Sequence, residues 1–334
     1  MGDVIGRVQS VLSGFGMPFV KLPVTELNLR AILLNGQSFR WRNIDRSFYG
    51  VVDGLLLYLR HDDEKFEWNC LGRAASAVEI DISRKMHDYF QLDIAMETLW
   101  EDWVARDSLM ADLRKVKELQ GIRILNQDPL ETLLAFICSS NNNIPRISKL
   151  GYAFPTLSKL TTVQDKLENV LREQLFGYRA KSVSETVKQL SQLPSTCLMD
   201  VQDLEIDEIR QFLLRFAGVA ECVALMSLGQ HQCVPIDRHV FDITKKYYIP
   251  SLRDTKLSNA LSRRLMEFYE DKFGKYAGWA QAVLFNQQLE KFVHAPLMEL
   301  PVKAPKNGKV LKKGRGRVRG VGGTVGDGSQ KASQ

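Results

Sequence analysis

The side chain best suited to acid–base chemistry in this sequence is Asp237, in the segment VPIDRHVFDI. A carboxylate at the start of a helix can orient a nucleophile, accept its proton and stabilise positive charge that develops on a substrate. An aspartate in this position also serves simply as an N-cap. The surrounding sequence has to decide between these two interpretations.

Three consecutive amides, Asn141 to Asn143, precede Arg146 in the segment CSSNNNIPRI. They form a dense surface of donors and acceptors that a hydrophobic core would not tolerate, although asparagine also favours ordinary polar turns. Four other segments have equally plain readings as a strand turn, a helix C-cap, an interhelical loop and a core helix. In chain order they are GQSFRW (36–41), LFGYRAK (175–181), VPIDRHV (234–240) and YAGWAQAVLF (276–285).

Together, in this order and at these spacings, the five segments resemble the eukaryotic 8-oxoguanine DNA glycosylase family, a branch of the helix-hairpin-helix DNA glycosylases. The resemblance runs from about residue 20 to about residue 292, and CSSNNNIPRI and YAGWAQAVLF are specific to this family. It implies a base-excision-repair enzyme, a DNA N-glycosylase with lyase activity at abasic sites. Such an enzyme flips 8-oxoguanine opposite cytosine out of duplex DNA and excises it.

The resemblance implies which residues contact the lesion base. The carbonyl of Gly36 would accept the extra N–H that distinguishes 8-oxoguanine from guanine, and Gln281 would bind the base edge. Phe285 and Cys222 would lie on the two faces of the ring, and Pro235 would complete the base-binding set. Asp237 would be the catalytic residue. No cofactor and no metal ion is implied.

A second set of residues is implied to bind the DNA around the flipped base. Asn141 would fill the vacated space, and Tyr178 would wedge into the base stack. Arg146 and Arg179 would donate to the orphaned cytosine, for which the guanidinium fork is well suited. His239, two residues after the aspartate, would also contact DNA.

The family pattern is broken in one place. Before VAEC the family has a glycine-rich hairpin of the form L-P-G-[VI]-G-x-K, whose N–H groups hold a DNA phosphate and whose lysine forms a Schiff base with the sugar. Here residues 211–228 read QFLLRFAGVAECVALMSL, with one glycine and no lysine. The simplest alignment removes about four residues, G-x-K-V, between Val219 and Ala220. The lysines that follow, Lys245 and Lys246, are expected to point away from Asp237 on helical geometry.

Two local geometries and three interpretations follow from this loss. In the first geometry a single helix replaces the hairpin, because seven apolar or small residues keep one helical phase across Gly218. They are Ile209, Phe212, Leu213, Phe216, Ala220, Val223 and Ser227. In the competing geometry the chain makes a tight turn at Ala217 and Gly218. The chain is either a weak hydrolase in which Asp237 activates water, a lesion-binding module without catalysis, or a splice or gene-model variant of an ordinary enzyme. The genomic reading frame at this point would separate the last two.

The fold class indicated is α+β, with an N-terminal antiparallel sheet beside two mainly helical lobes. Short β-like segments occupy about 20–70, and apolar residues at helical spacing dominate after Asp81. Asp128 is expected to cap a helix whose buried stripe is Leu130, Leu133, Leu134 and Ile137, with Glu131 reaching back to the cap. We divide the chain into an N-terminal extension (1–19), a β domain (20–115), a helical domain (116–300) and a basic disordered tail (301–334).

The composition is that of a globular protein of 334 residues with a charged tail. Residues 301–334 hold nine of the 45 Lys and Arg residues and one of the 39 acids, so 1–300 has 36 basic against 38 acidic residues. The tail is either a nuclear address, a phosphate-binding arm or merely solvated. Five widely spaced cysteines indicate a reducing compartment and no structural zinc. We expect a monomer that binds duplex DNA and no membrane, located in the nucleus, with a mitochondrial location as the alternative.

Overall fold

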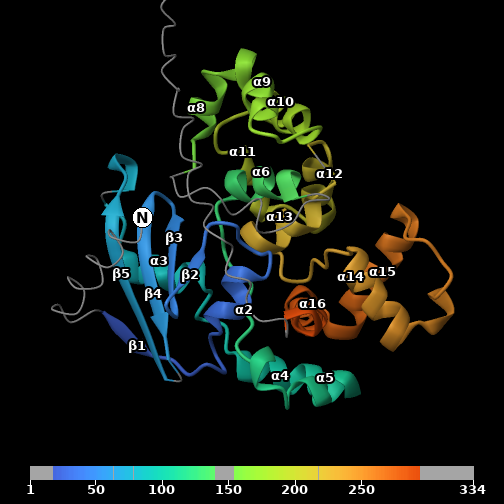
Figure 1. Ribbon diagram of the computed structural model, residues 1–334. Coiled ribbons are helices and arrows are strands. Elements are labelled where there is room, and N and C mark those ends of the chain that lie inside the picture. Colours follow the sequence, from blue (N-terminus) through green and yellow to red (C-terminus); the bar gives the residue numbers. More distant parts are fainter. Residues whose placement is uncertain (1–17, 63, 78, 140–153, 217, 294–334) are drawn as a thin grey trace, which may run out of the picture. The chain divides into compact units, whose positions relative to one another are not determined.

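A five-stranded antiparallel sheet forms the N-terminal part of the protein (Figure 1). The computed structural model describes residues 18–62, 64–77, 79–139, 154–216 and 218–293. In the sheet the strand order is β1-β5-β4-β3-β2, with bounds β1 (Phe19–Lys21), β2 (Arg42–Ile44), β3 (Ser47–Val52), β4 (Leu55–His61) and β5 (Lys65–Arg73). This confirms the antiparallel sheet predicted from the sequence.

Two tight turns connect the neighbouring strands β2, β3 and β4. Asp45 and Arg46 have φ of 49° and 63°, and Asp53 and Gly54 have φ of 48° and 77°. Positive φ at both central residues is the geometry of a type I′ turn, whose twist matches that of the flanking strands. Aspartate and glycine adopt this region more readily than bulky residues do. The turn residues therefore help to set the register of the sheet.

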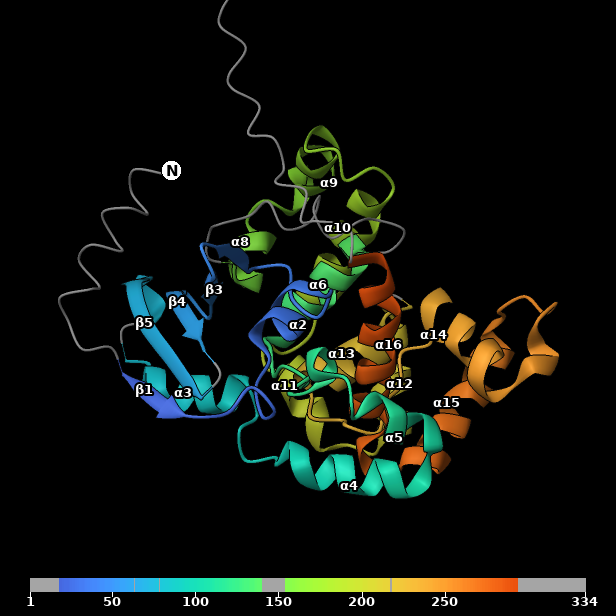
Figure 2. The ribbon, with the colours of Figure 1, turned by 60° about the horizontal axis from the view of Figure 1, so that its bottom comes forward.

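The rest of the described chain is mainly helical, as predicted (Figures 1 and 2). Helices near the sheet or following it are α2 (Leu29–Leu34), α3 (Ile82–Tyr89), α4 (Met96–Arg106), α5 (Ser108–Leu113) and α6 (Pro129–Ser139). Those of the central region are α8 (Leu157–Thr161), α9 (Gln164–Glu173), α10 (Arg179–Leu190), α11 (Cys197–Asp200), α12 (Ile206–Leu214) and α13 (Ala220–Ser227). The last are α14 (Arg238–Ile243), α15 (Asn259–Phe273) and α16 (Ala277–Val293).

Short helical turns lie between these helices. Among the described residues five are 3₁₀ turns, η1 (Ala75–Ala77), η2 (Lys117–Leu119), η3 (Val201–Asp203), η5 (Pro250–Leu252) and η6 (Gly274–Tyr276). The sixth, η4 (Thr244–Tyr248), is a π-helical turn that directly continues α14. Such turns are common as connectors, and π turns often accompany functional regions.

Helix α6 begins where the sequence predicts it. The N–H of Glu131 donates to the Asp128 carboxylate (2.7 Å), which confirms Asp128 as the cap. The predicted stripe faces the core, with Leu130 partly buried and Leu133, Leu134 and Ile137 fully buried. The prediction for the Glu131 side chain was wrong: it lies 2.9 Å from the Arg40 guanidinium. The two residues are distant in sequence, so helix patterns could not reveal this ion pair.

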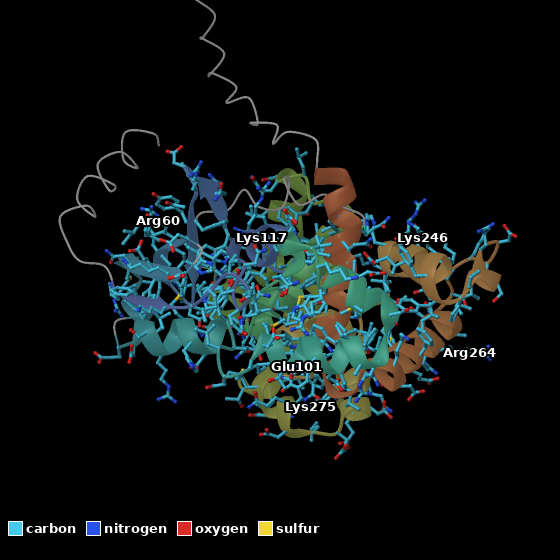
Figure 3. All side chains as sticks on the ribbon, turned by 90° about the horizontal axis from the view of Figure 1, so that it is seen from below. Arg60, Glu101, Lys117, Lys246, Arg264 and Lys275 are labelled. Atoms are coloured by element: carbon cyan, nitrogen blue, oxygen red, sulfur yellow. The ribbon has the colours of Figure 1, made fainter. Side chains whose placement is uncertain are left out.

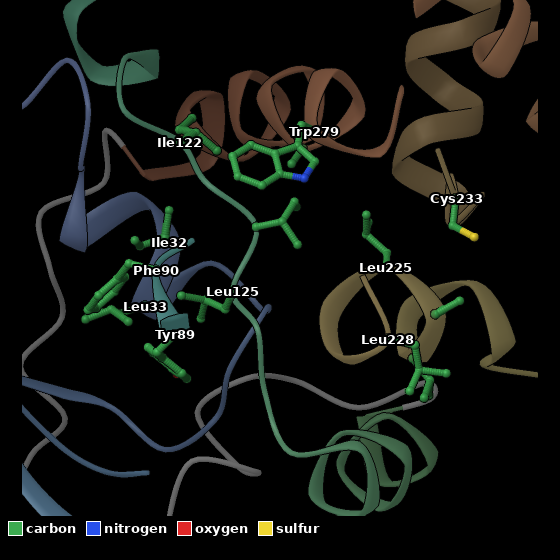
Figure 4. Close-up of a cluster of buried hydrophobic side chains, with 14 of the residues drawn as sticks. Ile32, Leu33, Tyr89, Phe90, Ile122, Leu125, Leu225, Leu228, Cys233 and Trp279 are labelled. Carbon is green, nitrogen blue, oxygen red and sulfur yellow. The ribbon is translucent and has the colours of Figure 1, made fainter. Parts of the chain in front are cut away.

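The main core joins the sheet region to the helices (Figure 4). Ile32 and Leu33 of α2 lie on one side, Trp279 of α16 covers the centre, and Leu225 of α13 lies on the other side. Leu125, in the extended segment that precedes α6, packs between them. These four apolar residues and the tryptophan are at most 1% exposed. The hydrophobic core therefore fixes α2, α13 and α16 with respect to one another.

Charged side chains cover the outside of the described chain. Figure 3 shows Arg60 on the sheet, Lys246 beside α14 and Arg264 on α15, together with acidic residues such as Glu101. Residues 1–300 carry nearly equal numbers of the two signs, 36 basic and 38 acidic residues. No helix in the described ranges has both the length and the apolar character needed to cross a membrane.

Candidate active site

Asp237 stands at the first turn of α14, at the end of the extended segment that follows α13. Its backbone is extended (φ −97°, ψ −174°), and its carboxylate accepts a hydrogen bond from the N–H of Val240 (2.8 Å). Part of the side chain remains accessible, yet the surrounding protein removes enough hydration to raise the carboxyl pKa above its usual range. The hydrogen bond from Val240 and the nearby His239 oppose that shift. The residue is an N-cap that also presents a carboxylate of increased basicity.

A cavity of about 900 Å³ opens in front of Asp237, and we name it the Asp237 cleft. Its walls are the α12–α13 connection, the segment before α14 and the start of α15. Gly218, Cys222 and Pro235 line it together with the aspartate. Two predicted base-binding residues therefore share a cavity with the predicted catalytic residue.

No lysine is among the described residues that line the Asp237 cleft. The basic residues there are Arg210 and Arg263. Lys245, as expected, is directed elsewhere: its ammonium lies 2.6 Å from Asp242 and over the ring of Phe241. Lys246 likewise does not line the cleft. The cleft as described offers a carboxylate but no amine that could attack a sugar.

An ion network holds the walls of the cleft together. The Arg210 guanidinium of α12 lies 2.8 Å from Glu221 of α13 and 2.5 Å from Glu270 of α15. Burial alone would lower the pKa of this arginine, but Glu221 and Glu270 raise it above its usual range, so it stays charged. The Arg210 side chain therefore links α12 to α13 and α15 through charged hydrogen bonds.

The chain turns between α12 and α13, which decides between the two predicted geometries. Helix α12 ends at Leu214 and α13 begins at Ala220, whose preceding residue Val219 has φ −119° and ψ 17°. The single continuous helix was therefore wrong, and a turn is present; Ala217 itself lies outside the described residues. Both geometries bury Ile209 and Val223, so helical phase alone could not distinguish them.

Cys222 lies beside Asp237 with an unreactive thiol. Burial, followed by the negative charge of Asp237, raises the thiol pKa to about 12. At neutral pH it is a small neutral group, suited to packing on an apolar ring rather than to nucleophilic attack. The ring of Phe285, on α16, contacts His239 edge-on at 5.8 Å. Cys222 and Phe285 therefore both adjoin the first turn of α14.

Gly36 follows α2 in a bend with φ of 91°, a conformation that favours glycine. Gln37 holds this bend: its amide donates to the carbonyl of Arg123 (2.8 Å) and accepts from the N–H of Leu125 (3.1 Å). The side chain of Gln127 donates to the carbonyl of Gln37 (2.8 Å). The Gly36 backbone is thus anchored to the extended segment that leads into α6.

Helix α16 carries Gln281 and Phe285 and lies close to the Gly36 bend. Gln281 is 6% exposed, and the side chains of Asn286 and Asn35 are hydrogen bonded to each other. A Cβ at Gly278 would lie 2.3 Å from the Cys233 carbonyl, so glycine is needed for α16 to approach the segment before Asp237. Helix α16 therefore contacts both the Gly36 bend and the segment before Asp237, but Gly36, Gln281 and Phe285 are not among the residues that line the Asp237 cleft.

Tyr178 and Arg179 lie at the start of α10. Tyr178 is 58% exposed, whereas Arg179 is 8% exposed and its guanidinium lies 4.6 Å from the centre of the Tyr178 ring. The charge of Arg179 acts on Cys138, which shows that α10 starts near the end of α6. Asn141 and Arg146 themselves lie outside the described residues.

Sequence reasoning missed the residues that support the site. Gln37, Asn286 and Arg210 are polar groups whose partners are distant in sequence. Only Gln37 lay within a recognised motif, GQSFRW. The motif does not show which backbone groups the Gln37 side chain binds. No group of three or more His, Cys, Asp or Glu residues in the described ranges could hold a metal ion.

Comparisons with known proteins identify the family to which the chain belongs. A family model for the N-terminal domain of 8-oxoguanine DNA glycosylase matches residues 19–133. The N-glycosylase/DNA lyase OGG1 of Arabidopsis thaliana is 35% identical over 298 residues, which cover 81% of this chain and 80% of that protein. The N-glycosylase/DNA lyase of Saccharomyces cerevisiae is 33% identical, covering 81% and 86%.

A solved structure of the 8-oxoguanine glycosylase/lyase of Clostridium acetobutylicum, in complex with DNA containing cytosine opposite 8-oxoguanine, is also similar. It superposes with a TM-score of 0.66 at 27% identity, and the match covers 80% of this chain and 93% of that one. The likeness extends over both the sheet and the helices.

Proposed function

Because the chain belongs to the 8-oxoguanine N-glycosylase/DNA lyase family, we propose that it recognises and excises 8-oxoguanine paired with cytosine in duplex DNA during base-excision repair. The observation that carries this proposal is the shared placement of Asp237, Cys222 and Pro235 in one cleft. A buried scaffold fixes the Gly36 bend and α16 beside it.

Recognition begins with extrusion of the base. Flipping costs a few kcal/mol, and contacts to the base and to its partner offset this cost. The exposed ring of Tyr178 wedges into the stack, and Asn141 fills the vacated position. Arg146 and Arg179 donate to the orphaned cytosine. These roles follow the family pattern at matching positions, and the exposure of Tyr178 supports the first of them.

The Gly36 carbonyl distinguishes the lesion from guanine. It accepts the N–H that only the oxidised base carries, whereas guanine would leave this carbonyl unpaired. Gln37 supports the discrimination because its three hydrogen bonds restrict movement of the bend. Gln281 binds the base edge, and Phe285 and Cys222 lie on the ring faces.

Asp237 supplies the chemistry that this chain retains. Its carboxylate accepts a proton from a water that attacks the sugar, and it stabilises the positive charge that develops there as the glycosidic bond breaks. The products are the free base and an intact abasic site. With no lysine lining the described cleft, attack by an amine and strand cleavage through a Schiff base are not available.

The remaining features complete the proposal. We assign a monomer located in the nucleus, where the basic tail of residues 301–334 adds affinity for phosphates without sequence preference. A β domain (20–115) and a helical domain (116–300) contribute residues to the same site. Residues 1–19 are an extension.

Fluorescence anisotropy tests the recognition. Duplexes that differ only at one pair, 8-oxoguanine:cytosine, 8-oxoguanine:adenine and guanine:cytosine, are titrated with the full chain at two salt concentrations. We expect the first to bind most tightly and all affinities to fall steeply with salt. Equal affinity for the three duplexes would refute the proposal.

Base release is measured separately, by alkaline cleavage of the DNA after incubation with the chain. Slow release that needs alkali to break the strand indicates hydrolysis directed by Asp237. Tight lesion binding with no release above the Asp237→Asn control would instead identify a lesion-binding module, the second candidate that the missing lysine favours.

A further inference from the structure

The turn between α9 and α10 contains a leucine in a backbone conformation that glycine usually occupies. Leu175 has φ of 66°. Its N–H donates to the carbonyl of Arg172 (3.0 Å), and the N–H of Phe176 donates to the carbonyl of Leu171 (3.0 Å). This pair of bonds is a Schellman motif, in which the left-handed residue after the helix is most often glycine. Here it is leucine.

The Leu175 side chain is mostly exposed to solvent. It is 72% exposed, the highest value among the large hydrophobic side chains of the described residues. A left-handed conformation is costly for a residue with a Cβ atom, such as Leu175. The turn itself is open, because a Cβ added at the neighbouring Gly177 would meet no atom within 4 Å. The other non-glycine residues of positive φ in the described ranges are polar, namely Asp45, Arg46, Asp53 and Gln91.

The neighbours of Leu175 suggest what it contacts. Tyr178, three residues later in the same turn, is 58% exposed. Residues 174–184 contain two basic side chains, Arg179 and Lys181, and no acid. An exposed apolar side chain beside an exposed aromatic ring and basic groups is suited to a polyanion whose interior is apolar, which describes the stacked bases of duplex DNA.

We propose that Leu175 is a second apolar wedge, which enters the base stack of duplex DNA next to the Tyr178 ring. This inference rests on the proposed function, which places Tyr178 at the DNA. Leucine is among the side chains that proteins insert between base steps, where it unstacks the bases and kinks the duplex. The side chain is 72% exposed and therefore accessible to DNA.

Substitution of Leu175 tests its two proposed effects, which are backbone strain in the protein and insertion into the base stack. Leu175→Gly removes the wedge and the strain together, so we expect the melting temperature to rise by about 1–3 °C. Affinity for the 8-oxoguanine:cytosine duplex should fall about five- to tenfold. Since leucine contacts no phosphate, the dependence of affinity on salt should keep its slope. A 2-aminopurine base beside the lesion should brighten less on binding.

Three further variants serve as controls. Leu175→Asn keeps a residue that tolerates the left-handed region but is polar, and it should lose the same affinity. Leu175→Met should retain it. Leu204→Ala removes another exposed leucine, 45% exposed and outside this turn, and should leave DNA affinity unchanged.

The outcomes distinguish this inference from the function on which it rests. If the unmodified chain shows no lesion preference, the proposed function fails. If the unmodified chain prefers the lesion but Leu175→Gly and Leu175→Asn bind as tightly and perturb 2-aminopurine as strongly, the wedge is refuted and the function stands. A fall in melting temperature for Leu175→Gly would also contradict the proposal, because it would make the leucine structural.

Discussion

The Gly36 bend is proposed to read the base, the α12–α13 connection lines the Asp237 cleft, and the two are built differently. At the bend, Gln37 is 6% exposed, and its side chain and carbonyl make three hydrogen bonds to the segment before α6. At the connection, Gly218 is exposed, and a Cβ there would meet no atom within 4 Å. Buried hydrogen bonds fix the Gly36 bend in place, whereas the α12–α13 connection is exposed at the Asp237 cleft.

This difference explains how the chain can lack the family's hairpin and still keep the fold. Arg210 ties α12 to α13 and α15, and Ile209 and Val223 are fully buried on the two helices. These contacts involve neither the glycine-rich nest nor the lysine. The packing of α12, α13 and α15 therefore does not depend on the residues that carry the family's covalent chemistry.

Returning an amine to the open side should produce the largest change. In the family pattern the lysine stands two positions before the residue that matches Ala220; with G-x-K-V removed, Gly218 takes that distance from Ala220, and it lines the Asp237 cleft. We expect Gly218→Lys to give a borohydride-trappable complex with lesion DNA from a background of none. Insertion of Gly-Pro-Lys-Val between Val219 and Ala220 should trap more, because it also restores N–H groups for a phosphate.

Gly218→Arg is the matched control, since it adds a positive charge but no nucleophilic amine. It should bind DNA and form no adduct. Trapping by Gly218→Arg would show that another group is the nucleophile.

Removing the carboxylate tests the chemistry that remains. Asp237→Asn should reduce base release by about 10²–10⁴-fold and leave lesion affinity within a few-fold. The carboxylate is the active form and its pKa is raised, so the rate in the unmodified chain should fall, as pH is lowered, at a higher pH than for an ordinary aspartate. A rate profile identical in the variant would remove Asp237 from the mechanism.

A pair of alanine substitutions compares the two sides directly. Gln37→Ala leaves the Arg123 carbonyl and the Leu125 N–H unsatisfied in the interior, so we expect a loss of about 2–4 kcal/mol in the free energy of unfolding. Gly218→Ala meets no atom and should change it by less than about 1 kcal/mol. Urea denaturation measures both; equal effects would contradict the contrast between a buried bend and an open connection.

Arg179 sharpens the account of recognition. Arg179→Ala should reduce the preference for cytosine opposite the lesion by about 1–3 kcal/mol, the range for a good bidentate base contact. Arg172→Ala, which removes an exposed arginine paired with Glu168, is the control and should preserve that preference. If Arg179→Ala instead lowered affinity equally for all four bases opposite the lesion, Arg179 would contact DNA phosphates rather than the cytosine.

Deletion after Leu300 should have the smallest effect. It removes nine basic residues, so affinity at low salt should fall for every duplex alike and its salt dependence should become shallower. The ratio of affinities for lesion and undamaged DNA should stay within about twofold, since phosphate contacts carry no sequence information. A change in that ratio would show that the tail reads the lesion.

The sequence predicted features that local patterns determine. Short β-like segments located the sheet and helical spacing located the helices, and Asp128 and Asp237 were recognisable as caps because their types and neighbours favour helix starts. The Glu131–Arg40 pair, the Gln37 bonds and the Asn35–Asn286 pair join distant segments, so no local pattern contains them. The sequence could not distinguish a turn after α12 from a continuous helix, because both geometries bury the same apolar residues.

Borohydride trapping of the unmodified chain tests the central claim most directly. The chain is saturated with an 8-oxoguanine:cytosine duplex, treated with sodium borohydride and resolved under denaturing conditions, with the Gly-Pro-Lys-Val insertion alongside. Schiff-base formation requires an amine about 3 Å from the sugar C1′, and the described cleft has no lysine. We predict lesion binding without a covalent product in the unmodified chain, and a covalent product after insertion. Efficient trapping by the unmodified chain would contradict the account, because an amine would then reach the site.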